Sequence, residues 1–215
     1  MEIELLYADA HLAVCIKPVG VDSEHELPEL LRAAADGDFF CVHRLDRAVG
    51  GVMVCARTKE AAAALSAAFA ADGAQKAYLA VVQGVPDAPR GSMRDLLYHD
   101  AARNKSFVVT RARRGVKEAL LDYELLGSCA WEGRTLSALR ITLHTGRSHQ
   151  IRVQCASRGM PLVGDGRYGS AVRGCPPALW SESLQFTHPA SGEKLRFSAP
   201  PPAIFPWTEF AFDNP

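Results

Sequence analysis

The feature that most constrains the fold is a series of short apolar runs separated by Gly, Pro and Asp. Runs of this length, bounded by residues that favour turns, are typical of strands. The pattern is clearest over residues 134–144, where Leu136 and Ala138 fall on one side and Ser137 and Leu139 on the other. Side chains that alternate with a period of two indicate a β-strand. The runs read HLAVCIKPVG, FFCV, GVMVCA, KAYLAVVQG, KEALLDYELLG and TLSALRITLHTG.

Fewer segments favour helices. Thr58 is placed to cap a helix over residues 59–71, and Ser148 to cap another over residues 149–158. A shorter helix is expected to start at Pro28, because proline is favoured in the first turn. Helices are therefore expected to be a minority beside the strands.

Two hairpin turns are expected between strands. Trp131-Glu132-Gly133 separates two alternating runs, and HPASGEK from His188 forms a second turn. Antiparallel strands with few helices predict an α+β fold, with a mixed, mostly antiparallel central sheet flanked by a few helices and loops. Because the sequence shows no internal repeat and no clear linker, residues 1–215 are expected to form a single domain.

The composition is that of an ordinary globular protein, with 48% hydrophobic and 22% charged residues. Lys plus Arg and Asp plus Glu number 24 each, so the net charge is zero. No global field attracts a polyanion, and a nucleic acid would have to bind a local cationic patch. The balance is mildly unfavourable to RNA binding but does not exclude it.

The cysteines are expected to be reduced thiols of a cytoplasmic protein. No CxxC pair occurs and most cysteines lie in apolar runs, which favours core thiols over a zinc site or disulfides. The N-terminal segment does not resemble a signal peptide, and no apolar stretch is long enough to span a membrane. We therefore expect a cytoplasmic protein that does not bind a membrane and is monomeric by default. The cysteines are Cys15, Cys41, Cys55, Cys129, Cys155 and Cys175.

A charged loop follows one of the apolar runs. The segment VHRLDRAVGGVMV places His43, Arg44 and Asp46 between FFCV and GVMVCA. The pair Gly50-Gly51 lets the chain turn sharply and hold the carboxylate at the edge of a cleft. The structural alternative is an aspartate that caps a turn, beside a solvated arginine. HRLD also occurs in kinase catalytic loops, but the sequence has no Gly-rich phosphate loop and no DFG motif, which excludes a kinase.

A second polar cluster is TGRSHQIRVQCASRGMPLVGDGRYG, from Thr145 to Gly169. A helix that starts after Gly146 would present free N–H groups which, together with Arg147, suit a phosphate. His149 and Arg152 are three positions apart and therefore share a helix face, so both can enter one cleft. A helix cap and a surface pair are the alternative. Because His149 has no partner at ligand spacing, we expect neither a metal nor a cofactor.

Two further features suit an RNA ligand. Lys76 and Tyr78 alternate on the strand KAYLAVVQG and so share one face, although such a tyrosine is more often a half-buried core residue. Residues 103–117, RNKSFVVTRARRGVK, form a basic strip that contains no acidic residue and includes Phe107. The strip suits a phosphate backbone, and a solvated hairpin accounts for it equally well. Its basic residues are Arg103, Lys105, Arg111, Arg113, Arg114 and Lys117.

Taken together, these segments resemble the RluA-type RNA pseudouridine synthases from about Leu5 to Pro200. ADAHLAVCIKPVG is similar to that family's opening strand with its Lys-Pro turn, HRLDRAVGG to its catalytic loop, and KAYLAVVQG to its tyrosine strand. The second polar cluster is similar to its third motif, and LQFTHPASGEKLRFSAP to its closing hairpin. These pieces, in order and at sensible spacing, are highly specific together. The resemblance implies the pseudouridine synthase fold, a catalytic cleft and an RNA substrate, either rRNA or tRNA.

The resemblance also implies a role for each matching residue. Asp46 would be the catalytic carboxylate, attacking ribose C1′ or taking the C2′ proton, and Arg152 would pair with it and keep it ionised. Tyr78 would lie against the uracil ring and remove the C5 proton. Arg44 would enter the space left in the RNA stack by the flipped-out nucleotide. The residues expected to contact RNA beside that nucleotide are His43, Lys76, Arg147 and His149.

The sequence departs from the family pattern at two places. Val49-Gly50-Gly51 stands where Thr-Ser-Gly is common, so two hydroxyls that brace the turn are missing, and Gln154 stands where a histidine is usual. No basic S4-type N-terminal domain is present in the sequence, so target choice is expected to lie in the catalytic domain. Two alternatives stay open: a catalytically silent RNA-binding module and a nucleoside glycosidase, which also places a carboxylate near a sugar.

Overall fold

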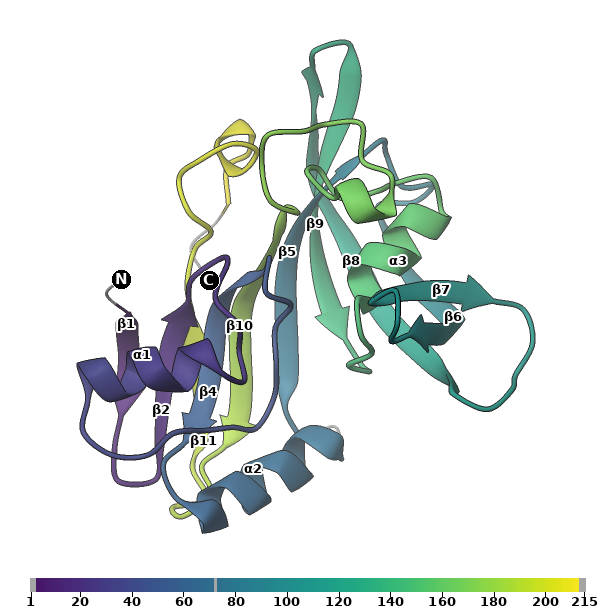
Figure 1. The fold of residues 1–215 in the computed structure, drawn as a ribbon. Helices are drawn as coiled ribbons and strands as arrows, with labels where there is room; N and C mark the ends of the chain where they lie inside the picture. Colours follow the sequence, from purple (N-terminus) through teal and green to yellow (C-terminus); the bar gives the residue numbers. More distant parts are fainter. Residues whose placement is uncertain (1–2, 72, 213–215) are drawn as a thin grey trace. The chain divides into compact units, whose positions relative to one another are not determined.

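The structure, a computed structural model, describes residues 3–71 and 73–212 and divides into two compact units. The first unit is built from residues 3–71, 73–76 and 180–200, and the second from residues 77–179 and 201–212. Figure 1 follows the chain through both units. The single domain expected for residues 1–215 stays a prediction.

The first unit is built on a sheet in the order β1-β2-β4-β10, with β3 beside β4 and β11 beside β10. β4 and β10 run parallel, with Trp180 opposite Gly50, and the other neighbours are antiparallel. The sheet is therefore mixed and mostly antiparallel, as predicted. The strands are β1 (Glu4–Ala8), β2 (Leu12–Lys17), β3 (Phe40–Cys41), β4 (Gly50–Ala56), β10 (Leu179–Thr187) and β11 (Lys194–Ser198).

Two helices cover the sheet of the first unit. α1 (Glu26–Ala34) lies over strands β1 and β2, as Figure 1 shows. α2 (Lys59–Ala70) begins at the predicted cap, where the Thr58 hydroxyl accepts a hydrogen bond from the Ala61 N–H at 3.1 Å. α2 packs Leu65 into a core that also contains apolar side chains of β2, β4 and β10. Burial of these side chains is the main stabilising term.

The second unit is built on an antiparallel sheet in the order β5-β9-β8-β6-β7. The long β8–β9 hairpin turns at Glu132 and Gly133, whose φ angles of 47° and 72° are those of a tight two-residue turn. This confirms the hairpin predicted at Trp131-Glu132-Gly133. The strands are β5 (Gln75–Gln83), β6 (Arg90–Asp100), β7 (Lys105–Val109), β8 (Val116–Trp131) and β9 (Arg134–Leu143).

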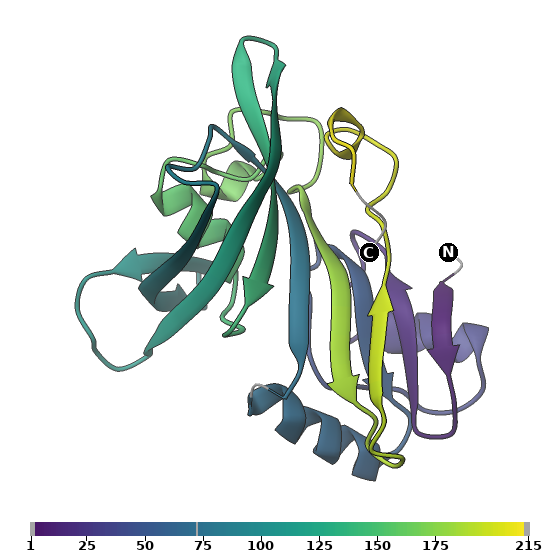
Figure 2. The same cartoon turned by 180° about the vertical axis from the view of Figure 1, so that it is seen from behind.

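The turn predicted at His188 is also present, between β10 and β11. Figure 2 shows these two strands side by side, joined by that turn. The His188 N–H donates to the Glu193 carbonyl at 2.7 Å and closes the loop. Both hairpins follow from local turn chemistry, which is why the sequence predicts them.

Two helix starts differ from the prediction. α1 begins at Glu26, ahead of Pro28. α3 (Gln150–Ser157) has His149 at its cap, in the left-handed conformation with φ 54°, and no side chain caps it. The predicted cap at Ser148 is therefore wrong, because the left-handed residue delays the helix by one position. The Ser148 carbonyl accepts a hydrogen bond from the Ser106 hydroxyl instead, at 2.6 Å.

The remaining helical turns are short. They are the 3-10 helices η1 (Gly166–Tyr168) and η2 (Trp207–Glu209). α3 packs Val153 against Leu97 and Ala119, which belong to β6 and β8. Within the described residues, no helix is both long enough and apolar enough to cross a membrane.

Candidate active site

Asp46 lies in the first unit, on the loop between β3 and β4. The Val49 N–H donates to the Asp46 carbonyl at 2.9 Å, which closes a turn immediately before β4. The side chain is half-buried, so its carboxylate is partly shielded from water. The loop therefore places a carboxylate at the start of a buried strand, as the sequence predicts.

The pair Gly50-Gly51 is required by the packing of β4 on β10. Gly51 has φ +120°, and a Cβ built there would lie 2.3 Å from the Ser181 carbonyl oxygen. A Cβ on Gly50 would lie 2.6 Å from the Trp180 ring. Only glycine permits this approach without a shift of the backbone. Close contact with β10 thus fixes the end of the loop where the missing hydroxyls would have braced it.

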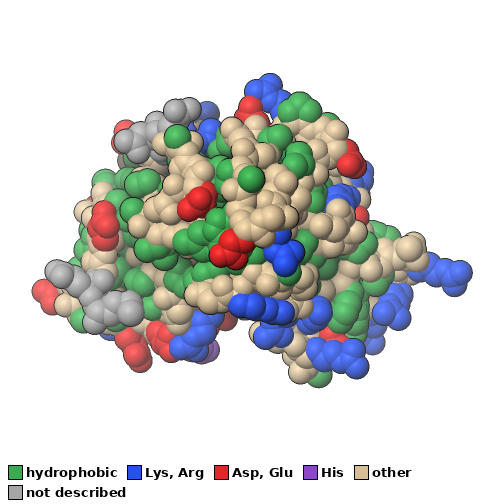
Figure 3. Space-filling model, turned by 90° about the horizontal axis from the view of Figure 1, so that it is seen from above, with side chains coloured by type: hydrophobic (Ala, Val, Ile, Leu, Met, Phe, Trp, Pro, Cys, Tyr) green, Lys and Arg blue, Asp and Glu red, His purple; other side chains and the backbone are tan. Residues whose placement is uncertain are grey.

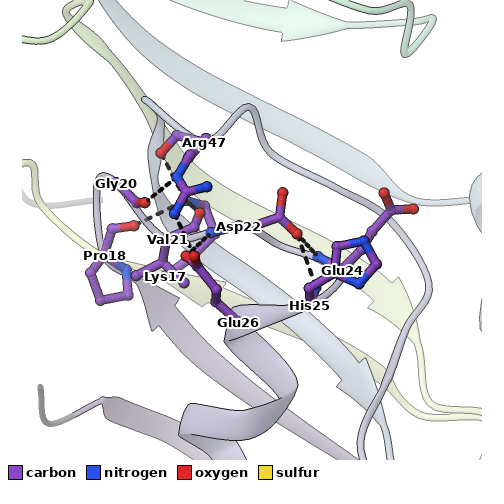
Figure 4. Close-up of polar contacts among 9 residues, drawn as sticks. All are labelled: Lys17, Pro18, Gly20, Val21, Asp22, Glu24, His25, Glu26 and Arg47. Atoms are coloured by element: carbon purple, nitrogen blue, oxygen red, sulfur yellow. Dashed lines mark hydrogen bonds and ion pairs between the residues drawn. The ribbon is translucent and has the colours of Figure 1, made fainter.

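The Lys17 ammonium contacts the same loop at Arg47 (Figure 4). Its side chain is fully buried, and its ammonium group donates to the carbonyls of Pro18 at 2.9 Å, Val21 at 2.7 Å and Arg47 at 3.4 Å. Burial lowers the pKa of Lys17 to about 8, against the opposing effect of the Asp22 and Asp46 carboxylates. Lys17 therefore carries a positive charge close to Asp46 at neutral pH.

Arg47 ties the loop to the segment that precedes α1. Its Nε donates to the Gly20 carbonyl at 2.8 Å, its guanidinium pairs with Glu26, and its own carbonyl accepts from the Gly20 N–H at 2.8 Å. Asp22 accepts from the N–H groups of Glu24 and His25 at 3.0 and 2.9 Å. The backbone on both sides of this contact is thereby fixed (Figure 4).

His43 and Arg44 take different positions although they are neighbours in sequence. The His43 Nε2 accepts a hydrogen bond from the Val54 N–H at 3.1 Å, and its ring stacks on Phe69 at 4.6 Å. Burial, with the nearby Lys76 ammonium, lowers the pKa of His43 to about 3, so the ring is neutral. Arg44 is exposed and pairs with Glu24 at 3.1 Å. Lys76 lies over the Phe69 ring at 5.4 Å.

Arg152 lies in the second unit and forms a buried ion pair with Asp165. Its Nε and Nη2 donate to the two carboxylate oxygens at 2.7 and 2.9 Å, and the two side chains are 7% and 1% exposed. The guanidinium also lies over the Tyr168 ring, 5.2 Å from its centroid. A bidentate pair in this setting holds the guanidinium plane in one orientation. The pairing of Arg152 with Asp46 stays a prediction.

Tyr168 connects α3 to β7. Its hydroxyl accepts a hydrogen bond from the Ser106 N–H at 2.8 Å and is hydrogen-bonded to the His149 Nδ1 at 2.9 Å. Burial raises the pKa of the Tyr168 phenol, which keeps it neutral. Arg147, next to this cluster, is directed to β8, where its Nε donates to the Glu118 carbonyl at 2.8 Å.

Tyr78 and Gln154 are both buried. Tyr78 lies on β5 opposite Ile141 of β9 and is 6% exposed. Gln154, at the position where the family has histidine, donates from its Nε2 to the Met93 carbonyl at 3.0 Å and to Asp95 at 2.7 Å. It thus anchors α3 to β6.

The basic strip lies on the β6–β7 hairpin and the segment that leads into β8. Lys105 is half-buried, with its ammonium over the Tyr168 ring at 5.3 Å, and Arg113 stacks on Tyr98 at 4.8 Å. The other strip residues are exposed: Arg103, Arg111, Arg114 and Lys117. Figure 3 shows one face of the molecule, on which Lys and Arg side chains gather toward one part of the edge.

Sequence reasoning assigned no role to Lys17, Asp165 or Tyr168. Lys17 is in the Lys-Pro turn, where a lysine within an apolar strand is the signal of a buried, fully paired ammonium. Asp165 and Tyr168 lie within GDGRYG. The signal there is a carboxylate and a phenol in a short segment bounded by glycines, which turn the chain sharply. Within residues 3–71 and 73–212, no cluster of His, Cys, Asp and Glu is suited to hold a metal ion.

A family model described as RNA pseudouridylate synthase matches residues 11–157, a span that includes Asp46, Tyr78 and Arg152. Curated relatives agree with it. The chain is 32% identical to Ribosomal large subunit pseudouridine synthase D of Pseudomonas aeruginosa over 244 residues, which cover 96% of this chain and 71% of that protein. It is 35% identical over 209 residues to Dual-specificity RNA pseudouridine synthase RluA of Escherichia coli, covering 91% of this chain and 92% of that protein.

A solved structure is similar as well. Human RNA Pseudouridylate Synthase Domain Containing 1 has a TM-score of 0.81 at 25% identity, covering 94% of this chain and 85% of that one. This likeness confirms the predicted α+β fold. The family model, the curated relatives and the solved structure all point to RNA pseudouridine synthases.

Proposed function

The chain belongs to the RNA pseudouridylate synthase family as an RNA-modifying isomerase, and from this premise we propose how its own residues carry out the reaction. The isomerisation breaks the bond between N1 of uracil and C1′ of the ribose, and joins C1′ to C5 of the same base. The C5 proton is lost and N1 gains one, so atoms and electrons balance without a redox partner. The observation that carries the proposal is the family match over residues 11–157.

We assign Asp46 as the catalytic carboxylate, which attacks C1′ or takes the C2′ proton of a flipped-out uridine. Half-burial on a loop held by Lys17, Arg47 and Gly51 supports this role, because a reacting carboxylate needs a fixed position. Lys17 places positive charge near Asp46. Arg152 is assigned as the second cation that pairs with it.

Tyr78 is assigned to lie against the uracil and to remove the C5 proton after the base has rotated. Its burial on a strand supports a fixed ring with restricted access for water. Arg44 is assigned to fill the gap in the RNA stack. Its exposure and its pairing with an equally exposed Glu24 support this, because an exposed pair is worth little and is readily exchanged for RNA.

We propose that the substrate is rRNA or tRNA and that it binds to the basic strip. We also propose that the protein acts as a monomer in the cytoplasm. Of the two relatives above, one is named for the large ribosomal subunit and the other for a dual specificity. The exposed arginines of the strip support contact with a phosphate backbone. His43, Lys76, Arg147 and His149 are proposed to contact RNA nearer the flipped nucleotide.

The test uses unmodified rRNA and tRNA transcripts that carry tritium at C5 of uridine. Wild-type protein should release tritium into water and leave pseudouridine in the RNA. Asp46→Asn should release none, while Asp38→Asn, the same change at an exposed surface position, should match wild type. Free uracil would indicate a glycosidase, and RNA binding without tritium release would indicate a silent binding module. Substantial release by Asp46→Asn would remove the role given to Asp46.

A further inference from the structure

Two cysteines face each other across β3 and β4, the strands that the Asp46 loop connects. Cys41 and Cys55 are direct partners in the antiparallel register, and their Sγ atoms are 3.8 Å apart. Antiparallel partners have Cα atoms roughly 4.5–5.5 Å apart, which lies within the span of about 4.4–6.8 Å that a disulfide bridges. No change of strand pairing is needed to join them.

The two thiols differ in their surroundings. Cys41 is partly exposed, whereas Cys55 is buried. The hydrogen bond between the two sulfurs lowers the pKa of Cys41 and raises that of Cys55, which burial raises further. Cys41 is therefore the residue of the pair that a soluble oxidant reaches first, with Cys55 held beside it as a resolving thiol.

We propose that Cys41 and Cys55 form a peroxide-sensitive site, in which Cys41 is oxidised first and Cys55 closes a disulfide. The Cys41 thiolate attacks one oxygen of hydrogen peroxide, the O–O bond breaks, and Cys41 becomes a sulfenic acid as hydroxide leaves. The Cys55 sulfur then loses its proton and attacks the Cys41 sulfur. The S–S bond forms, the S–O bond breaks, and water leaves. Peroxide is reduced by the same electron pair that the two thiols give up.

The bond would reach the active-site loop through Ser23. The Cys41 Sγ donates to the Ser23 carbonyl at 2.5 Å. The Ser23 hydroxyl in turn donates to the Leu45 carbonyl at 2.9 Å and accepts from the Leu45 N–H at 3.2 Å. Leu45 is the residue before Asp46, so Cys41 supports the loop through a single intermediate residue.

Disulfide formation removes that support. The sulfurs must move from 3.8 Å to about 2.05 Å apart, and Cys41 no longer carries a proton to donate to Ser23. A misplacement of about 1 Å in a catalytic group costs roughly 100-fold in rate. We therefore expect oxidation to lower turnover by up to about that factor. This consequence rests on the proposed role of Asp46, whereas formation of the bond does not.

The experiment treats purified full-length protein with hydrogen peroxide, blocks the remaining thiols, and maps peptides by mass spectrometry, with tritium release measured on the same samples. The expected result is a Cys41–Cys55 linked peptide with lowered turnover, both reversed by dithiothreitol. Cys41→Ser should keep its turnover in peroxide. Cys175→Ser, a change at another partly exposed cysteine, should respond as wild type does.

Several results would overturn the proposal. Oxidation of Cys129 or Cys175 ahead of Cys41 would show that the pair is not the sensitive site. Oxidation of Cys41 to a sulfinic acid without linkage would exclude Cys55 as its resolving partner. Linkage with unchanged turnover would overturn the effect on the loop. Absence of turnover in the reduced protein would count against the proposed function alone, because the peptide map does not depend on activity.

Discussion

The two units hold their candidate catalytic residues in different ways. In the first unit the Asp46 loop is held through its backbone: Lys17 and Arg47 donate to main-chain carbonyls, and Gly51 lies against another. In the second unit Arg152 is held through its side chain, by a bidentate pair with Asp165. Contacts to the backbone fix the position of the loop without using the Asp46 carboxylate itself to hold it. A bidentate side-chain pair ties the orientation of the Arg152 guanidinium to the Asp165 carboxylate.

Asp165→Asn should have the largest effect on stability, because it removes the charge that pairs with Arg152. Removing one charge of a buried ion pair costs up to about 3–5 kcal/mol. The free energy of unfolding, measured with urea, should fall by about that amount, and turnover should fall with it. Asp87→Asn, at an exposed loop position, is the matched control and should change neither. A loss no greater than that of the control would show that Arg152 does not depend on Asp165.

Lys17→Met should have the next largest effect, and it tests the hydrogen bonds that hold the Asp46 loop through its backbone. Methionine fills a similar volume, but it takes the ammonium donor from the Val21 carbonyl and leaves the Arg47 carbonyl with only the Gly20 N–H of its two donors named above. The expected cost is about 1–3 kcal/mol in the free energy of unfolding. Lys59→Met, an exposed change on α2, is the control. If Lys17→Met were as stable as the control, relief of the buried charge would outweigh the lost hydrogen bonds, and the loop would need another support.

His43 gives the first unit a pH dependence. Its pKa is about 3 in the folded protein and about 6.5 when unfolded, so the unfolded chain binds an extra proton between these values. The stability from its neutral ring is present above pH 6.5 and is lost as the pH falls towards 3. The slope is at most about 1.4 kcal/mol per pH unit. His43→Gln keeps an acceptor for the Val54 N–H and should remove this slope, measured as urea unfolding at several pH values. Parallel curves for the two proteins would contradict it.

The smallest effect is expected from a change in the basic strip, because no contact described above joins it to a candidate catalytic residue of either unit. Arg114→Ala removes one exposed cation. If it contacts a phosphate, RNA affinity should weaken evenly across sequences, and the slope of log affinity against log salt should drop by about one. Arg32→Ala, an exposed arginine of α1, is the control. An unchanged salt slope would place the phosphate backbone elsewhere.

The sequence predicts the parts of this account that depend on neighbours in the chain. Period-two alternation predicts the strands, Thr58 caps α2 as expected, and the Gly and Asp turns mark the hairpins, because each signal acts over a few residues. The Ser148 cap fails because a left-handed residue cannot be read from the residue types around it. The Arg152–Asp165 pair and the Cys41–Cys55 pair depend on tertiary contact and strand register, which one sequence does not specify.

We propose that the protein isomerises uridines in RNA through Asp46. The most direct test maps pseudouridine in total RNA from cells with and without the gene. Chemical labelling that stops reverse transcriptase at modified sites locates each pseudouridine. We predict at least one rRNA or tRNA site that vanishes without the gene and returns with wild-type protein but not with Asp46→Asn. A site that returned fully with Asp46→Asn, expressed at the wild-type level, would contradict the claim.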